Sequence, residues 1–243
     1  MKAIILAAGR GSRMKKATDE VPKCLVPVRG KPLLDWQVEA LHRAGISEIA
    51  IVTGYKRECL QGRGLVEFHN PRWESTNMVA SLACAEEWLR GEPCIISYSD
   101  IFYQPEAVTS LIECPAPLAV TYSVNWQELW EARFGDPLLD AETFRLNADG
   151  TLAEIGNQPR SLEQIEGQYM GLLRIEPTGW AAIEEIRSQL PAQERDRQHM
   201  TGTLQKVIER GGLPISAVPY SLDWGEVDNE SDAHFYNATK NKA

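Results

Sequence analysis

Short apolar runs and amphipathic segments alternate along the first half of the chain. The apolar runs end at glycine or polar residues, which is typical of strands buried on both faces of a sheet. They predict strands at 3–8, 48–53, 64–68, 94–98 and 118–124. Apolar residues at helical spacing predict one helix from Pro32 to the stop at Gly45, and another over 76–88. This alternation favours an α/β fold with a mostly parallel sheet.

The pattern changes after Trp126. Residues 143–146 and 151–155 flank the turn sequence N-A-D-G, which predicts a hairpin. The remaining apolar segments predict a strand at 169–175, a helix from Pro177, a helix over 203–210 and a strand at 215–218. No repeat or linker precedes the polar tail that follows Asn237. We therefore expect a single domain over residues 1–243, elaborated in its second half.

Composition and charge narrow the class of partner. Lys and Arg number 25 and Asp and Glu 34, so the net charge is −9. This balance argues against a nucleic-acid-binding protein, because affinity for the phosphate backbone comes from clustered Lys and Arg side chains. No apolar run is long enough for a membrane span, and the five cysteines form no C-x-x-C pair. We expect a cytoplasmic protein with reduced thiols that binds neither membranes nor nucleic acid.

An anion-binding loop is predicted where the first strand ends. The sequence A-A-G-R-G-S-R at 7–13 is followed by Pro22 and Lys23. Gly9 and Gly11 let backbone N–H groups approach an anion, while Arg13 and Lys23 supply positive charge. The spacing matches neither a Rossmann G-x-G-x-x-G nor a Walker loop. The alternative to an anion-binding loop is a turn that carries two exposed basic side chains.

The sequence L-A-A-G-R-G-S-R-M, with P-K ten residues later, resembles the signature of the nucleotidyltransferase superfamily. That superfamily includes sugar-1-phosphate nucleotidylyltransferases and small-molecule cytidylyltransferases. The resemblance implies a Rossmann-like fold with a mixed, mostly parallel sheet flanked by helices. It also implies that residues 1–125 bind the nucleotide, and that Arg13 and Lys23 are catalytic: Arg13 contacts the β and γ phosphates and Lys23 stabilises the transition state. Residues 126–243 would then bind the acceptor and complete a metal site.

Two aspartates fit the metal site that the resemblance implies. Asp100 ends the strand at 94–98, and Asp228 closes the sequence W-G-E-V-D, which is similar to the family's E-x-D element. Either aspartate alone is typical of a helix cap or a turn. Together with a phosphate loop they indicate Mg²⁺, which prefers carboxylate oxygens. Without a cation, two carboxylates that close would repel each other.

The resemblance extends to the nucleotide base. Asn70-Pro71 and the sequence S-T-N-M-V-A-S-L at 75–82 resemble the segment at the start of a helix in cytidylyltransferases. This resemblance implies CTP as the nucleotide donor. Thr53, Asn77 and Ser81 are uncharged and polar, as contacts to a cytosine edge require. Asn77 is equally suited to a helix N-cap, and the two roles are compatible. The expected nucleotide-binding residues are Leu6, Ala7, Ala8, Gly9, Gly11, Ser12, Arg13, Lys23, Thr53, Asn77 and Ser81.

The acceptor site is expected in the second half. The sequence G-Q-Y-M-G-L at 167–172 resembles the strand that lines the acceptor pocket in these enzymes, which implies Gln168, Tyr169 and Gly171. Arg133 and Arg160 are candidate anchors for an acceptor phosphate or carboxylate. Upstream, the side chains at 126 and 130 are tryptophans. They form either a cage for a quaternary ammonium or, as we favour, one apolar face of a helix.

The resemblance, together with these residues, implies a Mg²⁺-dependent cytidylyltransferase. It would transfer CMP from CTP to a small phosphorylated or phosphonate acceptor of the phosphonate, phosphoglutamine or phosphocholine type, and release pyrophosphate. A phosphate dianion needs no general base, and the four histidines lie in no motif. A sugar-1-phosphate nucleotidylyltransferase using UTP or dTTP, and a catalytically silent nucleotide-binding regulator, are the alternatives. A homodimer is left open.

Overall fold

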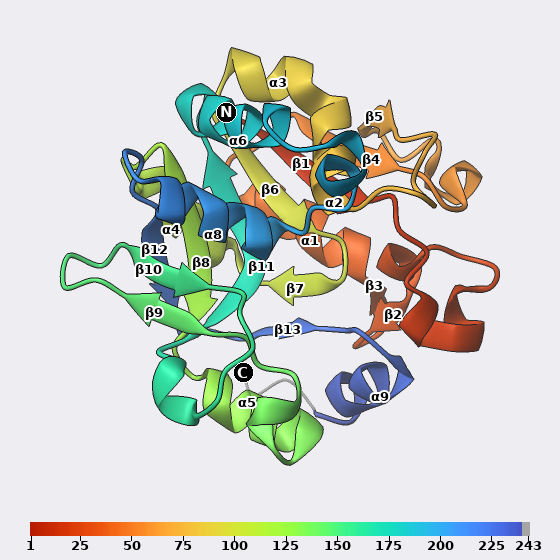
Figure 1. Cartoon of the computed structure of the whole chain (residues 1–243). Helices are drawn as coiled ribbons and strands as arrows, with labels where there is room; N and C mark the ends of the chain where they lie inside the picture. The colour runs from red at the N-terminus through yellow and green to blue at the C-terminus, as the bar shows by residue number, and fades with distance from the viewer. Residues whose placement is uncertain (240–243) are drawn as a thin grey trace.

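A seven-stranded mixed sheet forms the centre of the protein (Figure 1). A computed structural model describes residues 1–239, except for the side chains of Lys15 and Lys16. In spatial order the strands are β12 (Ser216–Tyr220), β8 (Leu118–Ser123), β11 (Gln168–Ile175), β6 (Cys94–Tyr98), β1 (Lys2–Ala7), β4 (Ile49–Thr53) and β5 (Val66–His69). Neighbouring strands are parallel except at β11, which is antiparallel to β6 and β8. The expected α/β fold with a mixed, mostly parallel sheet is confirmed.

Helices cover both faces of this sheet. One face carries α2 (Met78–Leu82), α3 (Glu86–Gly91), α6 (Pro177–Ser188) and α8 (Met200–Arg210). The other carries α1 (Leu33–Arg43), α4 (Pro105–Glu113) and α5 (Trp126–Phe134). Side chains of β1 alternate between the two layers, with Ile4 in the first and Ile5 in the second. A strand buried on both sides must be apolar at every position, which explains the uninterrupted run of β1.

Three two-stranded sheets surround the main one. They are β2 (Pro27–Val28) with β3 (Lys31–Pro32), β7 (Ile101–Tyr103) with β13 (Trp224–Glu226), and β9 (Phe144–Leu146) with β10 (Leu152–Ile155). The antiparallel pair β9–β10 confirms the hairpin. The pair β7–β13 joins the middle of the chain to its last thirty residues, and the Val227 amide donates to the Asp100 carbonyl at 2.9 Å.

Several predicted boundaries differ from the structure. The helix expected over 76–88 is broken into α2, a 3₁₀ turn and α3, and the helix expected from 203 begins at Met200. The strand β7 and the helices α4 and α9 (Glu230–Ala238) were not anticipated. Three residues are too few to show a period, and β7 exists because β13 pairs with it. The 3₁₀ turns are η1 (Ser12–Thr18), η2 (Lys23–Leu25), η3 (Arg57–Leu60), η4 (Ala83–Ala85), η5 (Pro137–Leu139) and η6 (Leu162–Gln164).

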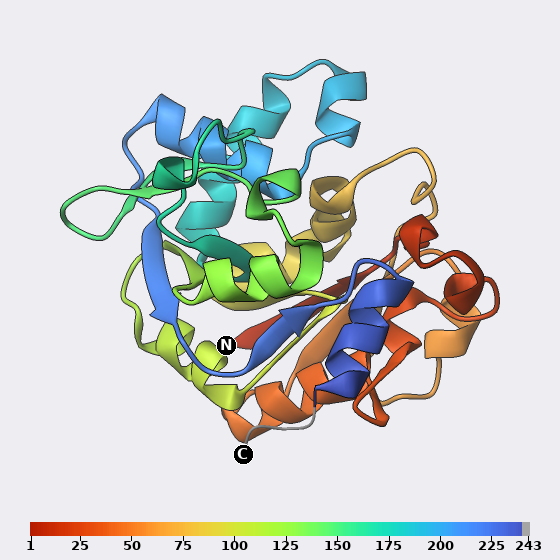
Figure 2. The ribbon, with the colours of Figure 1, turned by 90° about the horizontal axis from the view of Figure 1, so that it is seen from below.

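The last helix of the chain lies against the segment that follows β1. The helix α9, dark blue in Figures 1 and 2, lies beside the red segment that contains η1 and β2. Met14, Val28 and Tyr236 share one small apolar cluster there. A short helix, α7 (Ala192–Asp196), contacts the loop at 70–77, where the Asn77 backbone amide donates to the Asp196 carbonyl at 2.7 Å. Within residues 1–239, every helix is too short or too polar to cross a membrane.

Candidate active site

A cavity of about 300 Å³ lies at the carboxyl ends of β1 and β6, and we call it the strand-end cleft. Ligands of open α/β sheets bind at this edge. Its lining is formed by Leu6, Ala8, Gly9, Gly11, Ser12, Arg13, Lys23, Trp73, Thr76, Asn77, Met78, Ser81, Tyr98, Ser99, Asp100 and Asp228. Residues from the phosphate loop, the start of α2 and both expected metal positions therefore share one cavity.

The phosphate loop is shaped around Lys23. Gly11 has a φ of 68°, and a Cβ there would lie 2.9 Å from the Cβ of Lys23, so only glycine is accommodated. The Lys23 side chain is 9% exposed and reaches two carboxylates from distant parts of the chain. Its Nζ donates to Asp100 Oδ2 at 2.8 Å and to Asp228 Oδ1 at 3.0 Å. Arg13 also donates to Asp228 Oδ1, at 2.7 Å.

Three carboxylates converge at the boundary of the cleft. Asp100, Glu226 and Asp228 each offer an oxygen, and the three oxygens lie within 4.8 Å of one another. Asp100 Oδ1 is buried and has no hydrogen-bond partner among the side chains and backbone that the structure describes. An orphaned, buried carboxylate oxygen beside two further carboxylates is the donor set that a hard divalent cation such as Mg²⁺ requires. Glu226 belongs to the E-x-D element, of which only the aspartate was expected to bind the metal.

The cationic side chains offset the repulsion expected between these carboxylates. Burial lowers the pKa of Lys23, but the charges of Asp100 and Asp228 outweigh it and the net pKa is raised. Burial raises the pKa of Asp228, and Lys23 and Arg13 more than reverse that, so its net pKa is lowered. The pKa of Glu226 is raised well above its usual range by burial and by the charges of Asp228 and Asp100. Lys23 is therefore protonated and Asp228 ionised at neutral pH.

A second cavity of about 240 Å³ adjoins the cleft, and we call it the side pocket. The two share Arg13, Met78, Tyr98 and Asp228. The other residues that line the side pocket are Trp130, Asp140, Glu142, Thr143, Phe144, Ile155, Gln168, Tyr169, Gly171, His199, Met200, Thr201 and Glu226. Two ligands, one in each cavity, would therefore meet beside Arg13 and the carboxylates.

Residues 3–201 match the family model described as "MobA-like NTP transferase domain". The chain belongs to this family. CTP:phosphoglutamine cytidylyltransferase of Campylobacter jejuni is 35% identical over 251 residues, which cover 96% of this chain and 97% of that relative. CMP-5'-(3-aminopropyl)phosphonate synthase of Streptomyces rubellomurinus is 30% identical over 96% of this chain but only 37% of its own length. The solved inositol-1-phosphate CTP transferase of T. maritima shares the fold, with a TM-score of 0.76 at 19% identity over 97% of this chain and 94% of that one.

This NTP transferase holds Asn77 at the boundary of its two cavities. The Asn77 side chain caps α2 by accepting from the Met78 amide at 2.7 Å, as the capping alternative predicted. Its Nδ2 also lies 3.1 Å from Nε2 of His199, a side-pocket residue that no motif indicated. Ser81 Oγ accepts from the side-chain Nδ2 of Asn70 at 2.9 Å. Asn77 and Ser81 both line the cleft, where they were expected.

Four expected site residues lie outside both cavities. The Arg133 guanidinium is fully buried and donates twice to Asp232, at 3.1 Å each, so it is not available to an acceptor. Asp232 accepts in turn from the Asp228 amide at 2.9 Å, so Arg133 supports the metal position from behind. Arg160 is exposed on the surface. Thr53 donates to Glu67 at 2.6 Å, away from the cleft.

The fourth of these residues, Ala7, packs its methyl group into the layer that contains α1 and α4, on the opposite face from Leu6 and Ala8. Its expected contact with the nucleotide is not supported by the side chain's position. Trp126 and Trp130 lie on one buried face of α5, with ring centroids 6.5 Å apart. The apolar helix face is therefore correct and the aromatic cage is wrong, although Trp130 borders the side pocket.

The strand β11 supplies the other expected acceptor residues. Gln168, Tyr169 and Gly171 all line the side pocket. The amide of Gln168 is committed to the backbone, because Nε2 donates to the Glu142 carbonyl at 2.6 Å and Oε1 accepts from the Glu142 amide at 3.1 Å. Gln168 thus fixes the backbone at Glu142. Gly171 has a φ of 76° and packs against the Tyr98 ring, 2.8 Å from where its Cβ would lie.

Proposed function

We propose that this protein is a cytidylyltransferase that transfers CMP from CTP to a small phosphorylated or phosphonate acceptor and releases pyrophosphate. The observation that carries the proposal is the junction of two cavities at Arg13, Lys23 and three carboxylates. Residues 1–125 form the nucleotide-binding half, and residues 126–243 supply the acceptor pocket and complete the metal site. The relatives from C. jejuni and S. rubellomurinus support CTP as the donor. We place the reaction in the cytoplasm, where CTP is made and used.

The reaction is an in-line displacement at the α-phosphorus of CTP. An acceptor oxygen in the side pocket attacks phosphorus, a new P–O bond forms, and the bond to pyrophosphate breaks with its electron pair leaving on pyrophosphate. A phosphate monoester is largely dianionic at neutral pH, so its oxygen attacks without a general base. His199, the imidazole that lines the side pocket, is then free for a binding role.

The protein's part in this step is positioning and charge neutralisation. Lys23 and Arg13 hold their charges at the boundary between the cavities, where negative charge accumulates around the α-phosphorus. Asp100, Glu226 and Asp228 would hold Mg²⁺, which supplies further neutralisation of the nucleotide phosphates when bound. The buried Arg133–Asp232 pair keeps Asp228 in place while the ligands change.

Two other functions compete with this one. A sugar-1-phosphate nucleotidylyltransferase would use UTP or dTTP, and the uncharged Asn77 and Ser81 do not by themselves select a base. A silent regulator would need none of the charged machinery. The presence of Arg13, Lys23, Asp100 and Asp228 in one cavity argues against a catalytically inactive regulator.

A panel of nucleotides and acceptors tests the proposal. CTP, UTP, dTTP, ATP and GTP are each combined with phosphocholine, 2-aminoethylphosphonate, phosphoglutamine and glucose 1-phosphate, and pyrophosphate release is measured with Mg²⁺ and with EDTA. We expect Mg²⁺-dependent release with CTP and one of the first three acceptors. Release that requires UTP or dTTP with glucose 1-phosphate would establish the sugar-phosphate alternative. Binding of CTP without release in any mixture would establish the regulator.

A further inference from the structure

We propose that Asn70 sets the direction of a hydrogen bond from Ser81, and that this direction selects cytosine over uracil in the strand-end cleft. Asn70 lines neither cavity, so it acts as a positioning residue. The inference rests on the proposed function, because it concerns the base of the nucleotide donor. It supplies the base selection that Asn77 and Ser81 do not provide by themselves.

The side chain of Asn70 is fixed in one orientation. Asn70 follows β5 and is 3% exposed, and its backbone N–H donates to the Thr53 carbonyl at 2.8 Å. Its Oδ1 accepts from the Arg72 backbone N–H at 3.0 Å. Because a backbone N–H can only donate, the side-chain atom that it meets is the amide oxygen. The other side-chain atom is therefore the NH₂ group.

Both hydrogens of this NH₂ group are used within the protein. Nδ2 of Asn70 donates to Thr76 Oγ1 and to Ser81 Oγ, each at 2.9 Å. The Thr76 hydroxyl donates its own proton to the Arg72 carbonyl at 2.9 Å. The two hydroxyls that accept from Asn70 therefore differ, because the proton of Thr76 already has an acceptor in the protein.

The hydroxyl proton of Ser81 is the one left for a ligand. Its oxygen accepts from Asn70, and no residue in the described part of the chain accepts its proton. Ser81 is 5% exposed, so a proton that pointed away from the cleft would be buried without an acceptor, which is unfavourable. Ser81 also lines the cleft. It therefore offers a hydrogen-bond donor to a molecule bound there.

The position of Ser81 in the cleft suits a base better than a phosphate. Arg13 and Asp228 line both cavities, and Lys23 contacts Asp228, so these charges lie where the cleft meets the side pocket. Ser81 does not line the side pocket, and its partner Asn70 is uncharged. A nucleotide whose phosphates lie beside Lys23 therefore extends its base toward the uncharged part of the cleft.

A donor at this position distinguishes cytosine from uracil and thymine. N3 of cytosine carries a lone pair and accepts a hydrogen bond, whereas N3 of uracil and of thymine carries a hydrogen. The oxygen at position 2 is common to all three bases and cannot distinguish them. The Ser81 proton therefore pairs with N3 of CTP. In UTP or dTTP it would meet a second donor, and both donors would be left unpaired.

Matched nucleotides test the proposal. Isothermal titration calorimetry gives the Kd of CTP, UTP and 3-deaza-CTP, in which a C–H group replaces N3, with Mg²⁺ and without an acceptor. We expect the wild type to bind CTP about 10- to 100-fold more tightly than 3-deaza-CTP, the range for one unpaired buried hydrogen-bonding group. Ser81→Ala should bind the two alike, because the proton that N3 accepts is gone.

Asn70→Asp tests the direction of the hydrogen bond itself. A carboxylate oxygen in place of Nδ2 accepts from Ser81, whose oxygen then presents a lone pair to the cleft. The preference for CTP over UTP should fall by about 10- to 100-fold, since N3–H of uracil gains an acceptor. The added negative charge weakens the binding of both nucleotides alike and cancels in their ratio.

Asn125→Asp is the control, because Asn125 is exposed, lies outside both cavities and undergoes the same substitution. It should leave all three Kd values unchanged. Equal binding of CTP and 3-deaza-CTP by the wild type would overturn the proposal, as would an unchanged ratio of CTP to UTP binding in a folded Asn70→Asp protein. If Asn70→Asp does not fold, the comparison of Ser81→Ala with the wild type decides. Wild-type turnover with UTP or dTTP and glucose 1-phosphate, and none with CTP, would instead overturn the proposed function.

Discussion

At the scale of single residues, Lys23 is the side chain on which most of the site depends. Its ammonium bridges Asp100 and Asp228. The aliphatic carbons of its side chain lie close to where a Cβ at position 11 would be. A buried lysine is normally unfavourable, and here two carboxylates compensate for the lost hydration. The same charge is available to phosphate oxygens when a nucleotide enters, because Lys23 lines the cleft.

Lys23→Ala should lower kcat by about 10²–10³-fold and change the nucleotide KM much less, since the ammonium meets charge that grows in the transition state. The measurement is initial-rate kinetics of pyrophosphate release at saturating Mg²⁺ and acceptor. Lys206→Ala, at an exposed position of α8, is the matched control and should leave kcat unchanged. A Lys23→Ala protein with normal kcat would remove Lys23 from the catalytic step.

At the scale of elements, the loop after β1 and the turn η2 must fit each other closely. Gly11→Ala places a methyl group 2.9 Å from the Cβ of Lys23 at a φ of 68°. The left-handed conformation costs alanine about 1–2 kcal/mol of folding free energy. The displaced Lys23 should lower kcat/KM by about 10²-fold, the effect typical of a misplacement near 1 Å.

Gly62→Ala separates the loss of folding free energy from the loss of activity that a displaced Lys23 causes. Gly62 has a φ of 74°, and no described atom lies within 4 Å of its missing Cβ. Both variants should lose similar stability in chemical denaturation, and only Gly11→Ala should lose activity. Equal activity of the two would mean that the fit between the loop and Lys23 does not matter for catalysis.

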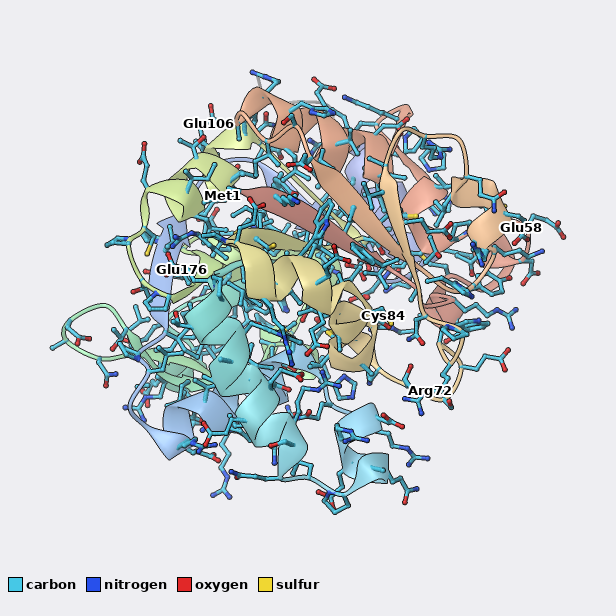
Figure 3. All side chains as sticks on the ribbon, turned by 90° about the horizontal axis from the view of Figure 1, so that it is seen from above. Met1, Glu58, Arg72, Cys84, Glu106 and Glu176 are labelled. Atoms are coloured by element: carbon cyan, nitrogen blue, oxygen red, sulfur yellow. The ribbon has the colours of Figure 1, made fainter. Side chains whose placement is uncertain are left out.

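A second contact between elements ties α7 to the loop that precedes α2. Arg72, labelled in Figure 3 beside α7, donates to both carboxylate oxygens of Asp196, at 2.9 and 3.0 Å. The hydrogen bond from Arg72 lowers the pKa of Asp196 below its usual value. The Asp196 carbonyl also accepts from the Asn77 amide at 2.7 Å, so the pair lies directly behind the cap of α2.

A carboxyl group with a lowered pKa in the folded state stabilises the protein above its unfolded pKa, about 3.9 for aspartate, and loses that contribution as the pH falls. Asp196→Asn should therefore lower the melting temperature slightly at pH 7, and its difference from the wild type should shrink as the pH falls below about 4. The effect is small because Arg72 is largely exposed. Melting curves between pH 3 and 8 test this, and a difference that persists unchanged at pH 3 would contradict the ion-pair explanation.

At the scale of the whole molecule, folding brings together carboxylates that are far apart in the chain. The pairing of β7 with β13 sets Asp100 and Asp228 on one cavity, and α9 closes against the N-terminal segment on the same side. The central position of β11, between β6 and β8, likewise inserts a strand of the second half into the sheet of the first. Neither half completes the site alone.

Asp100→Asn and Asp228→Asn should each abolish turnover, and the double variant should be little worse than either single one, because both carboxylates serve one ion. Pyrophosphate release gives the activities. The rise in melting temperature on adding Mg²⁺ with CTP, expected only for the wild type, gives an independent measure of metal binding. Losses that multiply in the double variant would show that the two residues do separate work.

The sequence by itself determined the α/β fold and the residues of the phosphate loop. Buried parallel strands leave an uninterrupted apolar run, as in β1, and the residues that follow such a strand lie at the ligand-binding edge. Both features are local, because burial on two faces restricts every residue of the strand. The cavity at this edge is accordingly lined by Arg13, Lys23, Asn77 and Asp100, as expected from the sequence.

Only the tertiary structure decided which charged groups face the ligands. Arg133 was an attractive anchor in the sequence, but its partner Asp232 lies 99 residues away and buries it. Asp140 and Glu142 lie in no motif, and they face the side pocket because Gln168 fixes the backbone around them. Hydrophobic periodicity is set by neighbours along the chain. The partner of a charged side chain is set by strands and helices that meet only when the whole chain has folded.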